Sequence, residues 1–77
     1  MDSFRIKLTP RAVEDLRGVP FPFRRQINQL FYKFKEDPRP AGAVLADGAY
    51  RLSVWAWVVL YEVDDADNVV TILAIVR

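Results

Sequence analysis

The chain has 77 residues and a formal net charge of +1, and it contains neither cysteine nor histidine. This composition excludes a disulfide framework, a Cys/His zinc site, and catalysis by a cysteine or histidine side chain. Hydrophobic residues make up 52% of the chain, which is enough to fill the core of one small domain spanning residues 1–77.

The start of the chain and its apolar runs bear on where the protein resides. Met1-Asp2-Ser3-Phe4 lacks the basic start and the following apolar stretch of a signal peptide. No apolar run approaches the ~20 residues that a membrane-spanning helix needs. The absence of cysteine is typical of a reducing compartment. These features predict a cytoplasmic protein with no membrane partner.

Charge is distributed unevenly along the chain. Residues 1–39 carry nine Lys/Arg and five Asp/Glu, a net charge of +4, whereas residues 40–77 carry two and five, a net charge of −3. The basic half permits an anionic partner, and the alternative is that its charges are solvated helix faces. The candidates for nucleic-acid or partner binding in this half are Arg24, Arg25 and Lys33.

The first pattern along the chain is that of a strand followed by a helix. Residues 4–8 alternate between apolar and basic side chains, the period of a half-buried strand whose apolar residues face the core. Thr9 is a good helix N-cap and Pro10 suits the first helical position, so a short helix is predicted from here to Gly18.

A longer second helix is predicted from Phe23 onward, where apolar residues recur at the spacing of one helical face. It is expected to stop at Asp37, because the residue before Pro38 avoids the helical conformation. The two helices are joined by a tight connection and should form a hairpin. The apolar face consists of Phe23, Ile27, Leu30, Phe31 and Phe34.

The second half of the chain is predicted to form strands. Residues 50–65, YRLSVWAWVVLYEVDD, are the most apolar and β-prone run. An irregular connector at 39–43 and a turn signal at 47–48 precede it, and a polar loop at 64–68 follows it. Residues 69–76 are apolar on both faces, as expected of an interior strand. The element order predicts an α+β fold, a two-layer βααβββ sandwich in which the N-terminal strand and the helical hairpin pack on a mainly antiparallel sheet.

Several motifs, in their order and spacing, resemble the RelE/ParE superfamily of toxins from type II toxin–antitoxin systems. The resemblance spans nearly the whole chain. Its markers are Leu8-Thr9-Pro10-Arg11-Ala12 with Asp15-Leu16, a long second helix ending in Asp37-Pro38, the segment Leu45-Ala46-Asp47-Gly48-Ala49-Tyr50-Arg51-Leu52, and Val59-Leu60-Tyr61-Glu62-Val63-Asp64.

The resemblance implies a toxin that a cognate antitoxin wraps and neutralises. It also implies one of two targets. RelE-like members are mRNA interferases that cut messenger RNA in the ribosomal A site and so inhibit translation, whereas ParE-like members poison DNA gyrase. In the RelE-like chemistry no metal or other cofactor is used. Basic residues on the sheet hold the scissile phosphate, stabilise its developing charge and assist proton transfer.

The family's site residues match this chain only in part. Arg51 occupies a basic position of the strand motif, where an arginine can pair with a phosphate through two hydrogen bonds. The next basic position is Ser53 here. The family's Gly-containing turn, aromatic residue and arginine are replaced by Trp55-Ala56, Trp57 and Val58. The turn chemistry and the motif arginine are therefore missing.

Two basic residues remain as catalytic candidates, Arg51 and Arg77, the latter in place of the family's C-terminal basic patch. The alternative for Arg51 is an outward-facing strand arginine that pairs with Glu62 across the hairpin. Because each lost electrostatic contact can cost ~10²–10³ in rate, we expect RNA cleavage to be weakened or absent. The alternative functions are a ParE-like gyrase inhibitor or a non-catalytic antitoxin-binding module of the same fold.

The aromatic residues of the strand region allow two interpretations. In an extended strand Trp55 and Trp57 share one face with Ser53 and Tyr61 and pack in the core. If a hairpin turn lies at Trp55-Ala56, as in the family, one tryptophan is near the surface and can stack on bases or dock a partner. Tyr61 is expected in the core with its hydroxyl hydrogen-bonded at the edge. All three aromatic residues are also candidates for nucleic-acid or partner binding.

Overall fold

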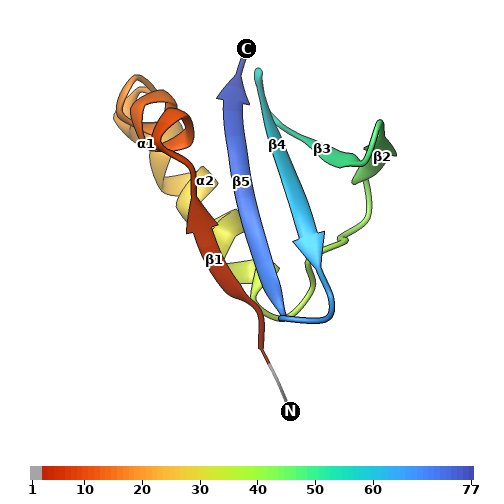
Figure 1. Cartoon of the computed structure of the whole chain (residues 1–77). Coiled ribbons are helices and arrows are strands. Elements are labelled where there is room, and N and C mark those ends of the chain that lie inside the picture. The colour runs from red at the N-terminus through yellow and green to blue at the C-terminus, as the bar shows by residue number, and fades with distance from the viewer. Residues whose placement is uncertain (1–2) are drawn as a thin grey trace.

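The computed structural model describes residues 3–77 and places them in two layers, a helical hairpin and a five-stranded sheet (Figure 1). The predicted α+β fold class is confirmed. None of the helices in the described part of the chain is long and apolar enough to cross a membrane. The elements are β1 (Arg5–Leu8), α1 (Pro10–Arg17), α2 (Phe21–Phe34), β2 (Val44–Ala46), β3 (Ala49–Val54), β4 (Trp57–Asp64) and β5 (Val69–Val76).

The strands lie in the order β1-β5-β4-β3-β2. β1 and β5 are parallel, and the hairpins β2–β3, β3–β4 and β4–β5 are antiparallel. The parallel pair is possible because the rest of the chain forms the long connection between its two strands. β5 has a neighbour on each side, which explains why residues 69–76 are apolar on both faces and confirms the prediction of an interior strand.

β2 is a strand that the predicted βααβββ order does not contain. It pairs with residues 49–51 of β3. Asp47 and Gly48 connect the two strands with φ angles of 53° and 81°, the two positive values that a type I′ hairpin turn requires. The predicted turn is confirmed, whereas a three-residue strand is too short to show the alternation that predicts a strand.

α1 begins at the predicted cap and is fastened to β5 by polar side chains. Thr9 Oγ1 accepts a hydrogen bond from the Ala12 N–H (3.1 Å) and donates one to the Leu73 carbonyl oxygen (2.9 Å). An Asp15 carboxylate oxygen accepts one from the Ile75 N–H (3.0 Å). Because β1 ends before this point, the two side chains satisfy backbone groups of β5 that β1 does not reach.

α2 covers the sheet with its predicted apolar face. Ile27, Phe31 and Phe34 are buried against strand residues in one core cluster. Phe23 lies at the margin of this contact and is 36% exposed. The helix begins at Phe21, somewhat earlier than its apolar face indicates, because a proline is tolerated in the first helical turn.

Tyr61 lies at the centre of an aromatic cluster in the core. Its ring centroid is 4.4 Å from that of Phe34 and 5.4 Å from that of Tyr50. Its hydroxyl donates a hydrogen bond to the Pro38 carbonyl oxygen (2.8 Å). Burial, reinforced by Tyr50, raises the pKa of Tyr61 to about 12, because deprotonation would place a charge in the core. The expected core position is confirmed. Since the side chain is fully buried, the prediction that it also contacts nucleic acid or a partner is wrong.

Candidate functional site

The face of the sheet opposite the helices carries a depression of about 210 Å³. Side chains alternate along β3, so Leu52 faces the core while its neighbours on the strand face outward. Val58 on β4 pairs with Ser53, and the loop before β2 forms the other side. The lining residues are Gly42, Val44, Arg51, Ser53 and Val58.

Arg51 is the cationic group of this depression. Its side chain is exposed, and its cross-strand neighbours are the apolar Val44 and Leu60. Glu62, the alternative partner expected from the sequence, pairs with Thr71 instead. Within residues 3–77, the ion pairs present do not include Arg51. The predicted pairing with Glu62 is therefore wrong, and the guanidinium is available to an anion.

Other basic side chains on this face are distant from the depression. Arg5 and Lys7 are exposed on β1, and β5 and β4 separate that strand from β3. At the usual ~4.8 Å between neighbouring strands, they lie roughly 14 Å away across the sheet. In the described residues 3–77, no group of acidic side chains is arranged to hold a metal ion. The chemistry available in the depression is thus one guanidinium beside a neutral hydroxyl.

Arg77, the second catalytic candidate, lies on the helix-covered side of the sheet. Its guanidinium carbon is 5.1 Å from the ring centroid of Trp57, and Trp57 packs against the core. The neighbouring pair Val58 and Val76 points to the opposite face, because side chains alternate along each strand. The structure therefore does not bring Arg77 together with Arg51, and the catalytic role of each stays a prediction.

A hairpin turn separates the two tryptophans. Val54 pairs with Trp57, so Trp55 and Ala56 form a two-residue turn, and Trp55 has a φ of 58°, where glycine is preferred. Trp55 is 73% exposed, whereas Trp57 is half-buried against the core. The prediction that both share a core face with Ser53 is wrong because the chain reverses between them. The alternative, with one tryptophan at the surface, is confirmed.

The basic residues of α2 have different environments. Arg24 donates hydrogen bonds from Nη2 to the carbonyl oxygens of Arg17 (2.9 Å) and Val19 (3.2 Å), so it satisfies backbone groups at the C-terminal end of α1. Arg25 and Lys33 are exposed, and in the described part of the chain neither forms an ion pair. Of the three predicted contact residues, Arg25 and Lys33 are open to a partner.

Arg39 forms contacts that no pattern in the sequence predicts. Its guanidinium makes two hydrogen bonds to the Asp65 carboxylate (3.2 and 2.6 Å), and its Nε donates to the Tyr50 hydroxyl (2.7 Å). The hydrogen bond to Asp65 is the main cause that raises the pKa of Arg39 above its usual value, and the hydrogen bond to Tyr50 is the second. Arg39 in turn lowers the pKa of Asp65. The contact fastens the connector after α2 to the β4–β5 loop. No local pattern reveals it, because Asp65 lies 26 residues further along the chain.

Comparison with sequence families gives one match. The family model described as the ParE toxin of the type II toxin–antitoxin system parDE matches residues 6–77, nearly the whole chain. No curated protein sequence matches it.

Solved structures with the same fold include RelE toxins. The archaeal RelE–RelB complex from Pyrococcus horikoshii OT3 matches with a TM-score of 0.86 at 22% identity, covering 97% of this chain and 94% of that one. The RelBE2 toxin–antitoxin complex from Mycobacterium tuberculosis matches with a TM-score of 0.84 at 18% identity, covering 97% and 98%. A mutant of E. coli toxin RelE in the free state matches with a TM-score of 0.83 at 21% identity, covering 100% and 84%. At these identities the likeness establishes the fold.

Proposed function

The chain belongs to the ParE toxin family of type II toxin–antitoxin systems, and we propose that it is held by a cognate antitoxin and stops growth by binding its target, with RNA cleavage weakened or absent. The observation that carries this proposal is the depression on the open sheet face. It contains a single guanidinium, that of Arg51, where the family resemblance expects several basic groups.

The neighbours of Arg51 cannot replace those groups. Ser53 presents a neutral hydroxyl, and Val58 and Val44 present methyl groups. None of these side chains stabilises the negative charge that develops on a phosphate during cleavage, and none transfers a proton readily near neutral pH. Since each missing preorganised contact costs ~10²–10³ in rate, a site with one arginine favours binding over catalysis.

Antitoxin binding is supported by relatives and by the surface of this chain. Two of the matched structures are toxin–antitoxin complexes, RelBE2 from Mycobacterium tuberculosis and RelE–RelB from Pyrococcus horikoshii OT3. The chain also exposes aromatic side chains that a small domain seldom leaves in water: Phe21, Tyr32 and Trp55 are 75%, 74% and 73% exposed. Large exposed aromatic side chains are typical anchors of protein interfaces.

The test is induced expression in bacterial cells, with and without the antitoxin that we expect to be encoded beside the gene. Wild type should arrest growth, the antitoxin should relieve the arrest, and Arg51→Ala should arrest growth to within about twofold of wild type at equal protein level. An absence of arrest, or arrest that the antitoxin leaves unchanged, would refute the proposal.

A second candidate function is ribosome-dependent RNA cleavage that depends on Arg51. It is favoured by the exposed guanidinium, which forms no ion pair within the described residues. Under this alternative Arg51→Ala abolishes growth arrest. For a binding toxin, two early measurements then separate the targets. An early fall in pulse-labelled protein synthesis indicates the ribosome, and an early loss of plasmid supercoiling on a gel indicates gyrase.

A further inference from the structure

The turn between β3 and β4 is apolar, although hairpin turns are formed mostly by glycine and polar residues. Residues 54–58, VWAWV, are five consecutive apolar residues, and Trp55 and Ala56 within them are both exposed. We call residues 54–57 the hairpin tip. Figure 1 shows it at the end of the sheet where β5 also ends, in agreement with the pairing of Val58 with Val76.

Trp55 occupies a backbone conformation that favours glycine. Of the two turn residues only Trp55 has a positive φ, 58°, which is the pattern of a type II′ turn with glycine preferred at this position. Tryptophan is disfavoured here twice, because its Cβ atom crowds the backbone and its ring is 73% exposed to water. Residues in such sparsely populated conformations cluster at functional sites, which makes Trp55 a candidate contact residue.

The hairpin tip adjoins the depression with Arg51. Ser53 and Val58 line that depression. They pair with each other, and the next pair along the hairpin belongs to the tip. A partner that enters the depression therefore also meets the tip. Since the proposed function gives this face of the sheet to the target, the target is the occupant expected at the tip.

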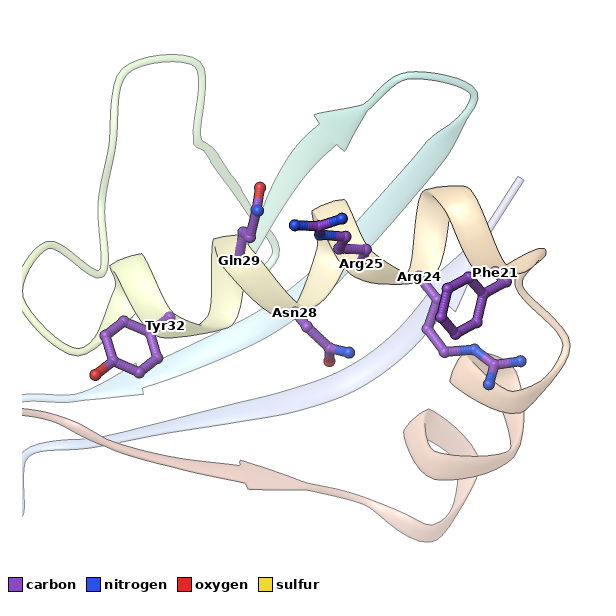
Figure 2. A pocket seen from close by; sticks show the side chains of 6 residues that line it. All are labelled: Phe21, Arg24, Arg25, Asn28, Gln29 and Tyr32. Atoms are coloured by element: carbon purple, nitrogen blue, oxygen red, sulfur yellow. The ribbon is translucent and has the colours of Figure 1, made fainter.

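The exposed rings of α2 lie elsewhere. Phe21 and Tyr32 are near opposite ends of that helix, with polar side chains between them (Figure 2). α2 packs on the face of the sheet opposite the depression. A partner bound only to α2 does not need to contact Trp55, so the role of the tip can be tested separately.

Two arginines flank the hairpin tip, one on each face of the sheet. Arg51 is the only charged residue in the segment 48–61 and lies on the open face. Arg77 lies over the Trp57 ring on the helix-covered side. Within residues 3–77 neither arginine forms an ion pair. Asp15, which accepts a hydrogen bond from β5, is paired with Arg11 (3.4 Å). The surroundings of the tip therefore complement an acidic partner.

A pocket on a protein suits this arrangement better than a nucleic-acid strand. Nucleic-acid backbones are bound by several cations along one groove, and here the two cations are on opposite faces of the sheet. Protein interfaces place tryptophan at an apolar centre with polar and charged groups around it. A pocket that receives the tip end-on meets both faces at once. Tip-to-tip contact with a second copy of this chain would place like charges together and is disfavoured.

We propose that the hairpin tip inserts Trp55 into an apolar pocket of the target protein, with carboxylates at the rim of that pocket facing Arg51 and Arg77. The inference rests on the target binding proposed above and adds to it the anchoring residue and the chemistry of the surface that it binds. Charges at a rim contribute less than a central anchor, in agreement with the small effect expected of Arg51→Ala.

The first experiment is growth arrest at measured protein levels. Trp55→Ala and Trp55→Gly should each raise the level needed for half-maximal arrest at least about tenfold, the effect of truncating an interface anchor. Trp55→Phe keeps an aromatic ring and should stay within about threefold of wild type. Leu45→Ala, which truncates an apolar side chain 59% exposed on β2, is the matched control and should arrest like wild type. Because Trp55→Gly relieves the backbone, its midpoint of urea unfolding should rise, which separates a loss of arrest from a loss of folding.

The second experiment uses purified proteins to identify the occupant. Wild type should bind one of the two candidate targets, gyrase or the ribosome, and Trp55→Ala should bind it at least about tenfold more weakly. Arg77→Glu should weaken this binding more than Arg77→Ala, and the difference should shrink at high salt. Trp55→Ala should keep wild-type affinity for the antitoxin and for labelled hexauridylate, a single-stranded RNA probe.

The outcomes separate this inference from the proposed function. If Trp55→Ala arrests growth as wild type does, the inference is wrong while target binding by another surface stands. If wild type causes no arrest, both are wrong. Binding of wild type to neither candidate target, or equal binding of Trp55→Ala, overturns the inference. A loss of affinity for hexauridylate would make the ring a base-stacking contact, and a loss of affinity for the antitoxin would place it in that interface. Either result contradicts a pocket on the target protein.

Discussion

Arg51 and Ser53 face the same side of β3, but they differ in what they can do to a phosphate. A guanidinium pairs with two phosphate oxygens at once, whereas a serine hydroxyl carries no charge at neutral pH. The position of Val58, which pairs with Ser53, would bring a second basic group into the depression if it held the family's arginine. The residues that the chain lacks are therefore adjacent to the one that it has.

This arrangement predicts a gain of function. The double variant Ser53→Lys/Val58→Arg should cut ribosome-bound messenger RNA at least ~10²-fold faster than wild type, because it restores preorganised charge beside Arg51. Primer extension in a purified translation system measures the rate. Ser53→Ala is the control and should behave like wild type. A double variant that folds, cosediments with ribosomes and still makes no cuts would show that the missing cations do not account for low activity.

Trp55 illustrates a local cost in the fold. With φ at 58°, its backbone adopts a left-handed conformation, which costs a residue with a Cβ atom roughly 1–2 kcal/mol. We predict that Trp55→Gly raises the free energy of unfolding by about 0.5–1 kcal/mol, part of the gain being offset by the greater freedom of glycine in the unfolded chain. Urea unfolding measures the change. Trp55→Ala keeps the Cβ and should show no such gain; equal stabilisation by alanine would disprove the backbone argument.

The pKa of Tyr61 predicts how stability changes in alkali. Its folded-state pKa of about 12 lies above the 10.0 of a tyrosine in water, so the folded state holds this proton more tightly than the unfolded state. The contribution is fully present below about pH 10 and is lost as the pH rises from about 10 to about 12. Denaturant unfolding at several pH values should show a fall in this window that is smaller in Tyr61→Phe. Parallel curves for the two proteins would contradict the assignment.

At the scale of elements, the junction of α1 with β5 depends on two polar side chains. β1 is too short to pair with the whole of β5, and Thr9 and Asp15 supply the hydrogen bonds beyond its end. The same aspartate is 3.4 Å from the Arg11 guanidinium. Deleting it leaves the Ile75 N–H without its partner in a part-buried position.

We predict that Asp15→Ala lowers the free energy of unfolding by ~1–3 kcal/mol, the usual cost of an unsatisfied buried donor. Asp15→Asn keeps an oxygen acceptor and should lose less. The matched control is Glu14→Ala, which removes an exposed ion pair with Arg17 and should change stability by less than about 0.5 kcal/mol. Thermal and urea unfolding supply the values. Equal effects at positions 14 and 15 would mean that the contact with β5 contributes little.

At the scale of the whole molecule, the depression with Arg51 and the exposed aromatic side chains of α2 lie on opposite sides. The depression is on the open face of the sheet, whereas Phe21 and Tyr32 are exposed on α2, which covers the other face. A partner that bound only to α2 would therefore leave Arg51 uncovered.

Periodicity predicts most of this architecture. Four patterns each have a local cause, and each corresponds to an element of the structure. They are the alternation in residues 4–8, the Thr9-Pro10 helix start, the apolar face of α2 and the two-sided apolar run at 69–76. β2 is missing from the prediction because its three residues show no period.

The candidate site is less predictable because it depends on register and turns. Trp55 is exposed because it lies in the turn between β3 and β4. Strand alternation after this turn places Arg77 on the opposite face of the sheet from Arg51. The contact of Arg39 with Asp65 joins segments that no local pattern links. The sequence thus identifies which basic residues remain, whereas only the folded chain shows which of them are near one another.

We propose that this toxin-family chain binds its target but scarcely cuts RNA, and a messenger RNA cleavage assay in a purified translation system tests this proposal. Wild type and Arg51→Ala are compared by primer extension at protein concentrations well above those of the ribosomes. We expect no codon-positioned cuts with either protein. Cuts made by wild type that disappear in Arg51→Ala would contradict this proposal and identify the chain as a ribosome-dependent ribonuclease.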